Sequence, residues 1–354
     1  MAGVNAGVVL ALGLAMLIPL AFSLLYRDGS WASFLVPAVI IPLGAVGLRA
    51  SRLRGGGYVL ERDVFFAVTL AWVLAAFLGG VPYLLEGTFA SPLNSTFEGM
   101  SGFTTTGATL LADIEAAPPY ILFWRSMTQW LGGIGIVVLF VAVAPAVGVG
   151  AARLLGAEVS GLTNERLTER IADTAKILLI VYLSISAAEV LALLAVGMPL
   201  YDAVVHTFAT VATGGFSPKT TSIAFYDSVA VEAVIIAFMT LSAVSFSLYY
   251  LLYTGRRRPE ALLDRELLTY LSVLAGAVLF VWGVLVFQGE YADSWGRAFR
   301  DAAFTVPGIM TSTGFVTADF DEWDTAAKFA LVALMFVGGC GFRRARRGAR
   351  RGPR

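Results

Sequence analysis

Long apolar stretches separated by short polar connections run along most of this chain. Seven of them are long enough to cross a membrane, because a transmembrane helix needs about 20 predominantly apolar residues. They lie near residues 4–25, 32–48, 63–85, 120–147, 173–197, 228–253 and 267–288. An eighth apolar stretch begins near residue 326 and is cut short. The pattern predicts an all-α membrane protein, and the first stretch is interpreted as a retained span because it lacks the basic start of a signal peptide.

Three stretches of mixed polarity lie between these apolar segments, at residues 91–113, 201–222 and 294–319. Each is too short and too polar to span a membrane alone. We expect each to contain a half-helix, and the half-helices run near 92–103, 201–211 and 295–310. Ser91 before Pro92, and Ser294 before the third, are typical helix-start residues.

A glycine next to hydroxyl-bearing or small residues recurs at the end of each half-helix. The three segments are Thr104-Thr105-Thr106-Gly107-Ala108, Ala212-Thr213-Gly214-Gly215-Phe216 and Thr311-Ser312-Thr313-Gly314-Phe315. Gly107 and Gly215 are 108 residues apart, and Gly215 and Gly314 are 99 apart. One such segment alone is typical of an ordinary turn. Three at matched positions favour a repeated unit of helix, half-helix, loop and helix.

The composition supports membrane insertion and argues against several chemistries. Of the 354 residues, 58% are hydrophobic, whereas soluble domains are about 45–50% apolar. The 25 basic residues balance the 25 acidic ones, so the net charge indicates no partner. One cysteine and one histidine argue against disulfide and metal chemistry. We find no H-E-x-x-H, Walker A or G-x-S-x-G pattern, so an enzyme has no positive support and no cofactor is expected besides a transported ion.

Basic residues gather in three connections and predict the topology. These hold Arg49, Arg52, Arg54 and Arg62; Arg153, Arg166, Arg170 and Lys176; and Arg256, Arg257, Arg258 and Arg265. Connections rich in Lys and Arg stay cytoplasmic. All three fall on one side only if the half-helices and glycine loops enter from the outer side. Non-helical backbone is tolerated at membrane depth where it is buried or lines a watery cavity, so these loops are candidates for a pore lining.

The loops have the chemistry of a cation filter. Rings of backbone carbonyls can replace the water shell of a potassium ion, and glycine reaches the required backbone angles without strain. We predict that the ion-lining pairs are Thr106-Gly107, Gly214-Gly215 and Thr313-Gly314, with Thr105, Thr213 and Ser312 one layer deeper. The C-terminal ends of the half-helices would point at the loops, where the negative end of a helix dipole favours a cation.

Other polar residues in apolar surroundings receive structural interpretations. His206 is expected to be a packed, hydrogen-bonded histidine rather than a proton relay. Glu189 and Glu232 fall in apolar spans, where a carboxylate is expensive and suggests function, although a nearby helix end or buried hydroxyl is an alternative explanation. The run from Gly132 to Gly135 is interpreted as close helix packing.

Four strings of residues together resemble the Trk/Ktr/HKT superfamily of potassium transporters, and most of all its TrkH branch. They are Ser101-Gly102-Phe103-Thr104-Thr105-Thr106-Gly107-Ala108, Trp130-Leu131-Gly132-Gly133-Ile134-Gly135, Thr210-Val211-Ala212-Thr213-Gly214-Gly215-Phe216-Ser217 and Thr313-Gly314-Phe315-Val316-Thr317-Ala318-Asp319. The resemblance extends from about residue 60 to Cys340. It implies four helix–pore-helix–filter–helix units around one pore with pseudo-fourfold symmetry. It also implies a multi-pass protein of the plasma (cell inner) membrane, a homodimer, and a cytoplasmic TrkA-type nucleotide-binding regulatory subunit.

Five segments follow from this resemblance, with a fourth filter unit expected to be missing. They are two N-terminal transmembrane helices at 1–58, pore units at 59–150, 151–256 and 257–340, and an aberrant basic tail at 341–354. The third unit has an incomplete second helix, and the tail is rich in arginine where the family continues with an intramembrane gate. We interpret the tail as the product of a frameshift or truncation, and a basic tail that reaches the lipid headgroups is the alternative.

The expected function is potassium uptake through a carbonyl filter, although we expect this exact polypeptide not to conduct on its own. A sodium-permeable or unselective conductance is one alternative. Gly107 favours potassium, since sodium-passing members of the resembled family carry serine at that position. A non-conducting membrane scaffold or dominant-negative subunit is the other alternative.

Overall fold

The computed structural model describes residues 2–26, 31–51, 61–135, 164–245, 248–249, 252, 265–287, 291 and 294–338. Within these residues the regular secondary structure is entirely helical, as predicted. Cys340, the basic tail 341–354 and most of the arginines in the three basic connections lie outside the described residues.

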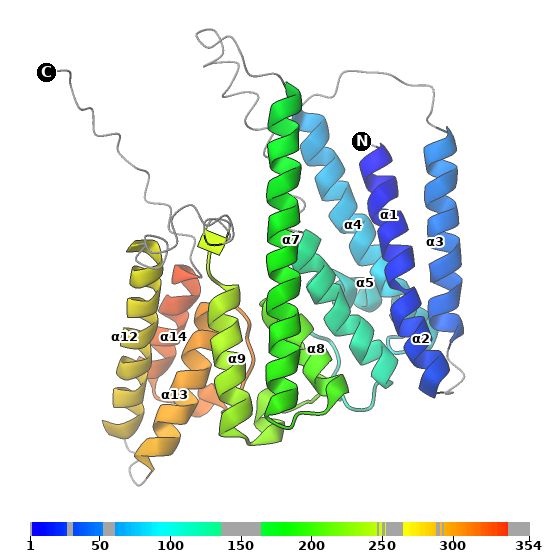
Figure 1. The fold of residues 1–354 in the computed structure, drawn as a ribbon. Coiled ribbons are helices and arrows are strands. Elements are labelled where there is room, and N and C mark those ends of the chain that lie inside the picture. The colour runs from blue at the N-terminus through cyan, green and yellow to red at the C-terminus, as the bar shows by residue number, and fades with distance from the viewer. Residues whose placement is uncertain are drawn as a thin grey trace, which may run out of the picture.

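The elements follow one another along the chain as upright helices and shorter pieces (Figure 1). They are α1 (Ala2–Ala15), α2 (Leu17–Tyr26), α3 (Ala32–Ser51), α4 (Glu61–Glu86), α5 (Pro92–Phe103), a helical segment at 119–135, α7 (Asn164–Ala195), α8 (Leu200–Val211), the 3-10 turn η1 (Ser222–Tyr226), α9 (Val229–Ser242), α12 (Arg265–Phe287), α13 (Trp295–Met310), the 3-10 turn η2 (Phe320–Glu322) and α14 (Thr325–Val337).

Four segments within these helices are long and apolar enough to cross a membrane: Ala6–Leu24, Phe65–Glu86, Ala175–Ala195 and Arg265–Phe287. The predicted first span is broken into α1 and α2 at Met16. Pro19 explains the break, because proline donates no backbone hydrogen bond and its ring clashes with the carbonyl four residues earlier. The predicted spans at 120–147 and 228–253 extend into residues that are not described.

The direction of the helices agrees with the predicted topology. Helices α4, α7 and α12 all begin at the upper end of the molecule in Figure 1. Arg62, Arg166 and Arg265 lie in their first turns. Helices α8 and α13 begin at the opposite end and run back into the molecule, as half-helices that enter from the outer side must do (Figure 1).

The three half-helices lie where they were predicted, as α5, α8 and α13. The Ser91 hydroxyl caps α5 by accepting a hydrogen bond from the Leu93 amide at 3.2 Å, with Pro92 at the first helical position. Ser294 precedes α13, but its side chain makes no capping hydrogen bond. Its carbonyl instead accepts from the Arg297 and Ala298 amides, so the helix starts there without a side-chain cap.

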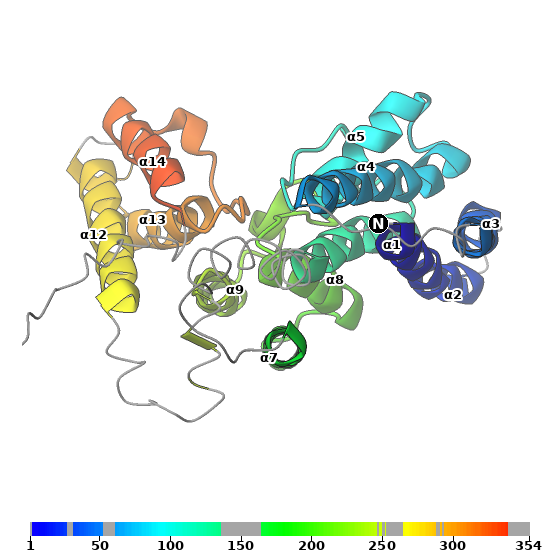
Figure 2. The ribbon, with the colours of Figure 1, turned by 90° about the horizontal axis from the view of Figure 1, so that it is seen from above.

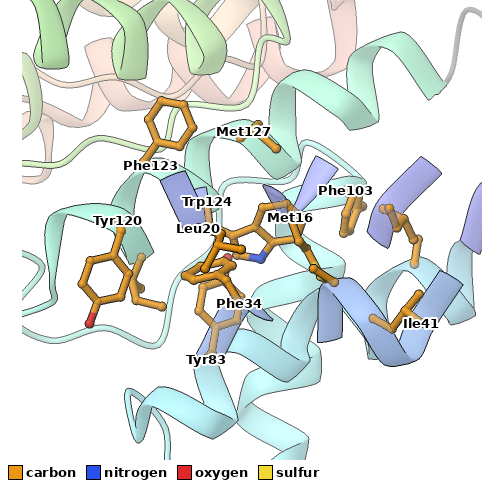
Figure 3. Packing of buried hydrophobic residues seen from close by; sticks show 14 of the residues in the cluster. Met16, Leu20, Phe34, Ile41, Tyr83, Phe103, Tyr120, Phe123, Trp124 and Met127 are labelled. Atoms are coloured by element: carbon orange, nitrogen blue, oxygen red, sulfur yellow. The ribbon is translucent and has the colours of Figure 1, made fainter. Parts of the chain in front are cut away.

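The N-terminal helices are held against the first unit by a buried cluster that surrounds Trp124. Figure 3 shows Met16, Leu20 and Phe34 gathered around the Trp124 indole. The indole N–H donates to the carbonyl of Gly79 in α4 at 2.9 Å, so this buried polar group is satisfied. The cluster therefore ties α1, α2 and α3 to the elements that carry the first half-helix.

Glycines allow α4 and α5 to approach each other closely. A side chain at Gly80 would collide with the Ser95 carbonyl, and one at Gly99 would collide with the Ala76 carbonyl. Such small residues are how helices approach inside membranes, where packing rather than water exclusion drives association. The position of α5, and of the loop that follows it, therefore depends on these two glycines.

Replacing Gly99 by valine should push α5 away from α4. Overpacking of this kind costs about 1–3 kcal/mol, so we expect a lower melting temperature for the detergent-solubilised protein. Gly276→Val in α12 is the matched control, because a side chain there meets nothing within 4 Å. Equal melting temperatures for the two variants would contradict the interpretation.

Candidate cation filter

The three glycine loops repeat the same backbone conformation. The residue two positions before the final glycine has a left-handed φ in each loop: 55° at Thr105, 51° at Thr213 and 57° at Ser312. The final glycines have φ values of 79° at Gly107, 74° at Gly215 and 77° at Gly314. The residue between them is outside the left-handed region in all three. This agreement shows that the repeat seen in the sequence is also a repeat of structure.

The first two half-helices end in a Schellman-type cap, with the left-handed residue directly after the C-cap. The third keeps the bond from the Ser312 amide to the Ile309 carbonyl, but its Gly308 carbonyl accepts from the Gly314 amide. In the first unit the Thr105 amide donates to the Gly102 carbonyl at 3.0 Å, and the Thr106 amide donates to Ser101 at 2.9 Å. Glycine is the usual residue at this position. A left-handed conformation costs an L-residue such as Thr105 about 1–2 kcal/mol. Strain of this kind persists where the surroundings enforce it, often at functional sites.

The three loops meet one another in sequence order. A side chain at Gly107 would collide with the carbonyl oxygen of Gly214, so the first loop abuts the second. A side chain at Gly215 would collide with the carbonyl oxygen of Thr313, so the second loop abuts the third. Figure 2 shows the segment after α13 reaching away from α12 and α14 toward the α8 and α9 region. Gly314 has no described atom within 4 Å of the corresponding position.

Adjacent predicted loops thus meet at two points, where the Gly214 carbonyl lies against Gly107 and the Thr313 carbonyl lies against Gly215. Thr106, Ser312 and Gly314 are exposed, while Gly214 and Thr313 are buried. Carbonyl oxygens at the negative ends of three half-helices have the chemistry to replace water oxygens around a monovalent cation.

Gln129 braces the second loop and was not identified from the sequence. Its side-chain amide, fully buried on the segment 119–135, donates to the Gly214 carbonyl at 2.6 Å. Its side-chain oxygen accepts from the Phe216 amide at 3.1 Å. One side chain therefore satisfies two backbone groups on either side of Gly215. A side chain at Gly214 would occupy the place of this amide.

The first and third loops use a different internal brace. Thr104 and Thr106 pair through their hydroxyls at 2.8 Å, and Thr311 and Thr313 do the same at 2.8 Å. The second loop has Ala212 and Gly214 at these positions. Gln129 of the preceding unit compensates for the missing hydroxyl pair.

A buried ion pair supports the segments that follow the first two loops. Glu98 of α5 accepts from Arg125 Nε at 2.7 Å, from the Thr109 hydroxyl at 2.8 Å and from the Leu110 amide at 3.0 Å. Both charged side chains are almost completely buried. Burial of charge requires pairing of this quality, because an uncompensated buried ion costs several kcal/mol.

Arg125 continues this network into the second unit. Its guanidinium donates to the Ser217 carbonyl at 3.1 Å and lies 3.6 Å from the centroid of the Phe216 ring, a cation–π contact. The Ser217 hydroxyl contacts His206 Nε2 at 3.2 Å. His206 is fully buried and its other ring nitrogen contacts the Asp202 carbonyl, as expected for a packed histidine.

The remaining sequence interpretations have mixed outcomes. Glu232 lies in the first turn of α9 and pairs with Arg300 of α13, so it ties the second unit to the third. Glu189 is fully buried, and neither carboxyl oxygen has a hydrogen-bond partner among the described residues. A side chain at Gly132 would collide with the Phe103 carbonyl, which confirms close packing at that glycine.

Outside the spans, burial raises the pKa of the Tyr226 hydroxyl in η1 above its ordinary value.

The spacing of Arg125 and Gln129 in the sequence indicates that the two side chains lie on the same face of a helix. They are four residues apart in a largely apolar stretch, and residues at that spacing lie one above the other on a helix. Their partners are distant in sequence, since Ser217 and Gly214 lie 92 and 85 residues further on.

Comparison with known protein families shows which family this chain belongs to. The family model of TrkH, described as a cation transport protein, matches residues 59–342. The chain belongs to the TrkH family. It is therefore a multi-pass membrane protein with the repeated pore-helix units of that family.

Relatives in the TrkH family extend across most of the chain. The Trk system potassium uptake protein TrkH of Halomonas elongata is 40% identical over 330 residues, which cover 92% of this chain and 68% of the relative. TrkH of Escherichia coli K12 is 35% identical over 328 residues, with the same coverage. The crystal structure of the potassium transporter TrkH from Vibrio parahaemolyticus matches with a TM-score of 0.84 and 31% identity, covering 96% of this chain and 70% of that one.

Gln129→Leu should destabilise the second loop by leaving the Gly214 carbonyl and the Phe216 amide without a partner. Each buried unsatisfied group costs about 1–3 kcal/mol, so we expect a lower melting temperature and faster amide exchange in a peptide covering 212–218. Met127→Leu is the control on the same helix, because it keeps volume and removes no hydrogen bond. Unchanged exchange in that peptide would argue against the brace.

Proposed function

We propose that this chain binds K⁺ through backbone carbonyls of residues 105–107, 213–215 and 312–314, and that these residues are its contribution to the filter of a potassium uptake pathway. The observation that carries the proposal is the threefold repeat of one left-handed backbone conformation, with adjacent loops in direct contact. A potassium ion needs its water oxygens replaced, and clustered main-chain oxygens do this without charged side chains. The names of the relatives as potassium uptake proteins support the choice of ion.

The buried braces explain how such a filter would discriminate between ions. Gln129 holds the second loop at the Gly214 carbonyl, and Glu98 and Arg125 hold the segments that follow the first two loops. The carbonyls of these loops therefore have little freedom to close around a smaller ion. Gly107 adds to this rigidity, because the first loop contacts the Gly214 carbonyl there so closely that a side chain has no room. These features favour potassium over a sodium-permeable or unselective conductance.

The assembly around this filter is part of the same proposal. We assign the helices at 1–58 to an N-terminal pair and the segments 59–150, 151–256 and 257–340 to three pore units. A homodimer and a cytoplasmic TrkA-type regulatory subunit are the proposed partners, and the plasma membrane is the proposed location. The sequence-based predictions of a missing fourth unit and of a frameshifted tail stay predictions, and sequencing of the locus in all three frames tests both.

The first experiment measures cation binding by the purified chain in nanodiscs. Isothermal titration with K⁺, Rb⁺ and Na⁺ should give tighter binding of K⁺ and Rb⁺ than of Na⁺. Equal affinities favour an unselective conductance, and absence of binding favours the scaffold. Growth of an uptake-deficient host on low potassium tests transport separately, and rescue by this exact polypeptide would refute the prediction that it does not conduct alone.

Gly107→Ala should weaken K⁺ binding at least tenfold. The added methyl group collides with the Gly214 carbonyl, and the φ of 79° is strained for alanine. Gly87→Ala is the matched control, since Gly87 has a φ of 78° but no described atom within 4 Å of the new methyl position. The control should lose similar stability from backbone strain and keep its K⁺ affinity. An equal loss of affinity in both variants would sink the filter assignment.

A further inference from the structure

The segment that leaves each filter loop is held differently in the three units. We define the exit segments as residues 108–111, 216–219 and 315–318. In the first unit, the Ser101 hydroxyl of α5 donates to the Ala108 carbonyl at 2.6 Å. The Thr109 hydroxyl donates to Glu98 of the same helix at 2.8 Å. Glu98 also accepts from the Leu110 amide at 3.0 Å, so three hydrogen bonds tie the first exit segment to its own pore helix.

The second exit segment is tied to its own pore helix once and to the first unit as well. His206 of α8 contacts the Ser217 hydroxyl at 3.2 Å. Glu98 and His206 both lie nine residues before the filter glycine, and Thr109 and Ser217 both lie two residues after it. The same brace between the same two positions thus recurs with different chemistry. Gln129 and Arg125 add support from outside the unit.

The third unit lacks this brace. The residue nine positions before Gly314 is Thr305, and the residue two positions after it is Val316, which has no polar side chain. The Thr305 hydroxyl is buried and has no hydrogen-bond partner among the described residues. Among the hydrogen bonds of the described residues, none joins a side chain of α13 to the third exit segment.

The last turns of the third pore helix also have fewer hydrogen-bonding groups than those of the first. Pro307 lies inside α13, where proline removes a backbone hydrogen bond. Gly308 follows, at the position that Ser101 occupies in the first unit. A Cβ atom at Gly308 would lie 3.1 Å from the Phe315 carbonyl oxygen, the counterpart of the Ala108 oxygen that Ser101 binds. The geometry for the brace is present, but the hydroxyl is absent.

What holds the third exit segment is the outer turn η1 of the second unit. The Ala224 amide donates to the Val316 carbonyl at 3.2 Å, and the Val316 amide donates to the Ser222 hydroxyl at 3.3 Å. Ser222 has a left-handed φ of 55°. The third loop itself is bonded to α13, since the Ser312 and Gly314 amides donate to the Ile309 and Gly308 carbonyls, but the exit segment that follows it is held by η1.

We infer that the third loop is the deformable wall of the filter and that Gly308 is a positioning residue for ion discrimination. A wall whose exit segment has no side-chain bond to its own pore helix can move inward around an ion smaller than K⁺, whereas the first and second loops, whose exit segments are braced, cannot. The absence of a hydroxyl at position 308 therefore limits how strongly this filter rejects Na⁺. The mechanical part of this inference stands on the contacts alone, and the part about ions rests on the proposed function.

The mechanical part is tested by amide hydrogen exchange of the full chain in nanodiscs. Peptides covering 312–318 should exchange several-fold faster than those covering 105–111 and 213–219. Gly308→Ser should slow exchange of the third loop, because its hydroxyl reaches the Phe315 carbonyl. Gly308→Ala adds the same Cβ without the hydroxyl and should not slow it. Ser101→Ala is an independent variant, and it should speed exchange of the first loop.

The ionic part is tested by the ratio of Na⁺ to K⁺ dissociation constants in the same samples. One net hydrogen bond corresponds to a factor of about 2–10 in an equilibrium constant. We expect Gly308→Ser to raise the ratio within that range relative to Gly308→Ala, and Ser101→Ala to lower it.

Distinct results separate the possible failures. Equal exchange in all three loops, or identical behaviour of the serine and alanine variants at position 308, would overturn the inference. If the unmodified chain binds no monovalent cation while the exchange contrast holds, the proposed function fails and the deformable third loop is still supported. If K⁺ binds selectively but the ratio does not respond to Gly308→Ser, the role of Gly308 in discrimination is refuted.

Discussion

Backbone that leaves the helix at membrane depth must find partners for its polar groups, and the arrangement of this protein depends on that constraint. Three loops do so at the ends of α5, α8 and α13, each with the same pair of left-handed residues and with amides bonded to the last turn of its half-helix. The caps satisfy the first amides of each loop, and buried side chains satisfy groups on the far side of the glycine. In the second loop, which lacks the threonine pair of the other two, Gln129 satisfies one backbone group on each side of Gly215.

The pseudo-symmetric units are alike in backbone and unlike in support. The position nine residues before the filter glycine is Glu98 in one unit, His206 in the next and Thr305 in the third. All three are buried and polar, but only the first two reach the exit segment of their own loop. The residues at equivalent positions differ while the loop conformation stays the same. What differs between the units is how firmly each exit segment is held.

The sequence predicted the elements well because local rules govern them. Apolar length located the spans, and Ser91-Pro92 and the glycines located the half-helices to within a residue or so. The break at Met16 follows from Pro19 and was within reach of the same rules. The pairing of Arg125 with Glu98, and of Gln129 with the second loop, was not, since a polar residue in an apolar stretch does not reveal which distant backbone it meets. Ser294 shows the converse, because a residue suited to capping makes no cap.

The direction of support along the chain has a consequence for biogenesis. Arg125 and Gln129 hold groups at 214–217, and η1 holds Val316, so each later loop leans on residues synthesised before it. Chains fold from the N-terminus as they emerge during synthesis. Each unit would then insert next to residues that have already folded and that its loop contacts. The units would therefore assemble in the order in which they are translated.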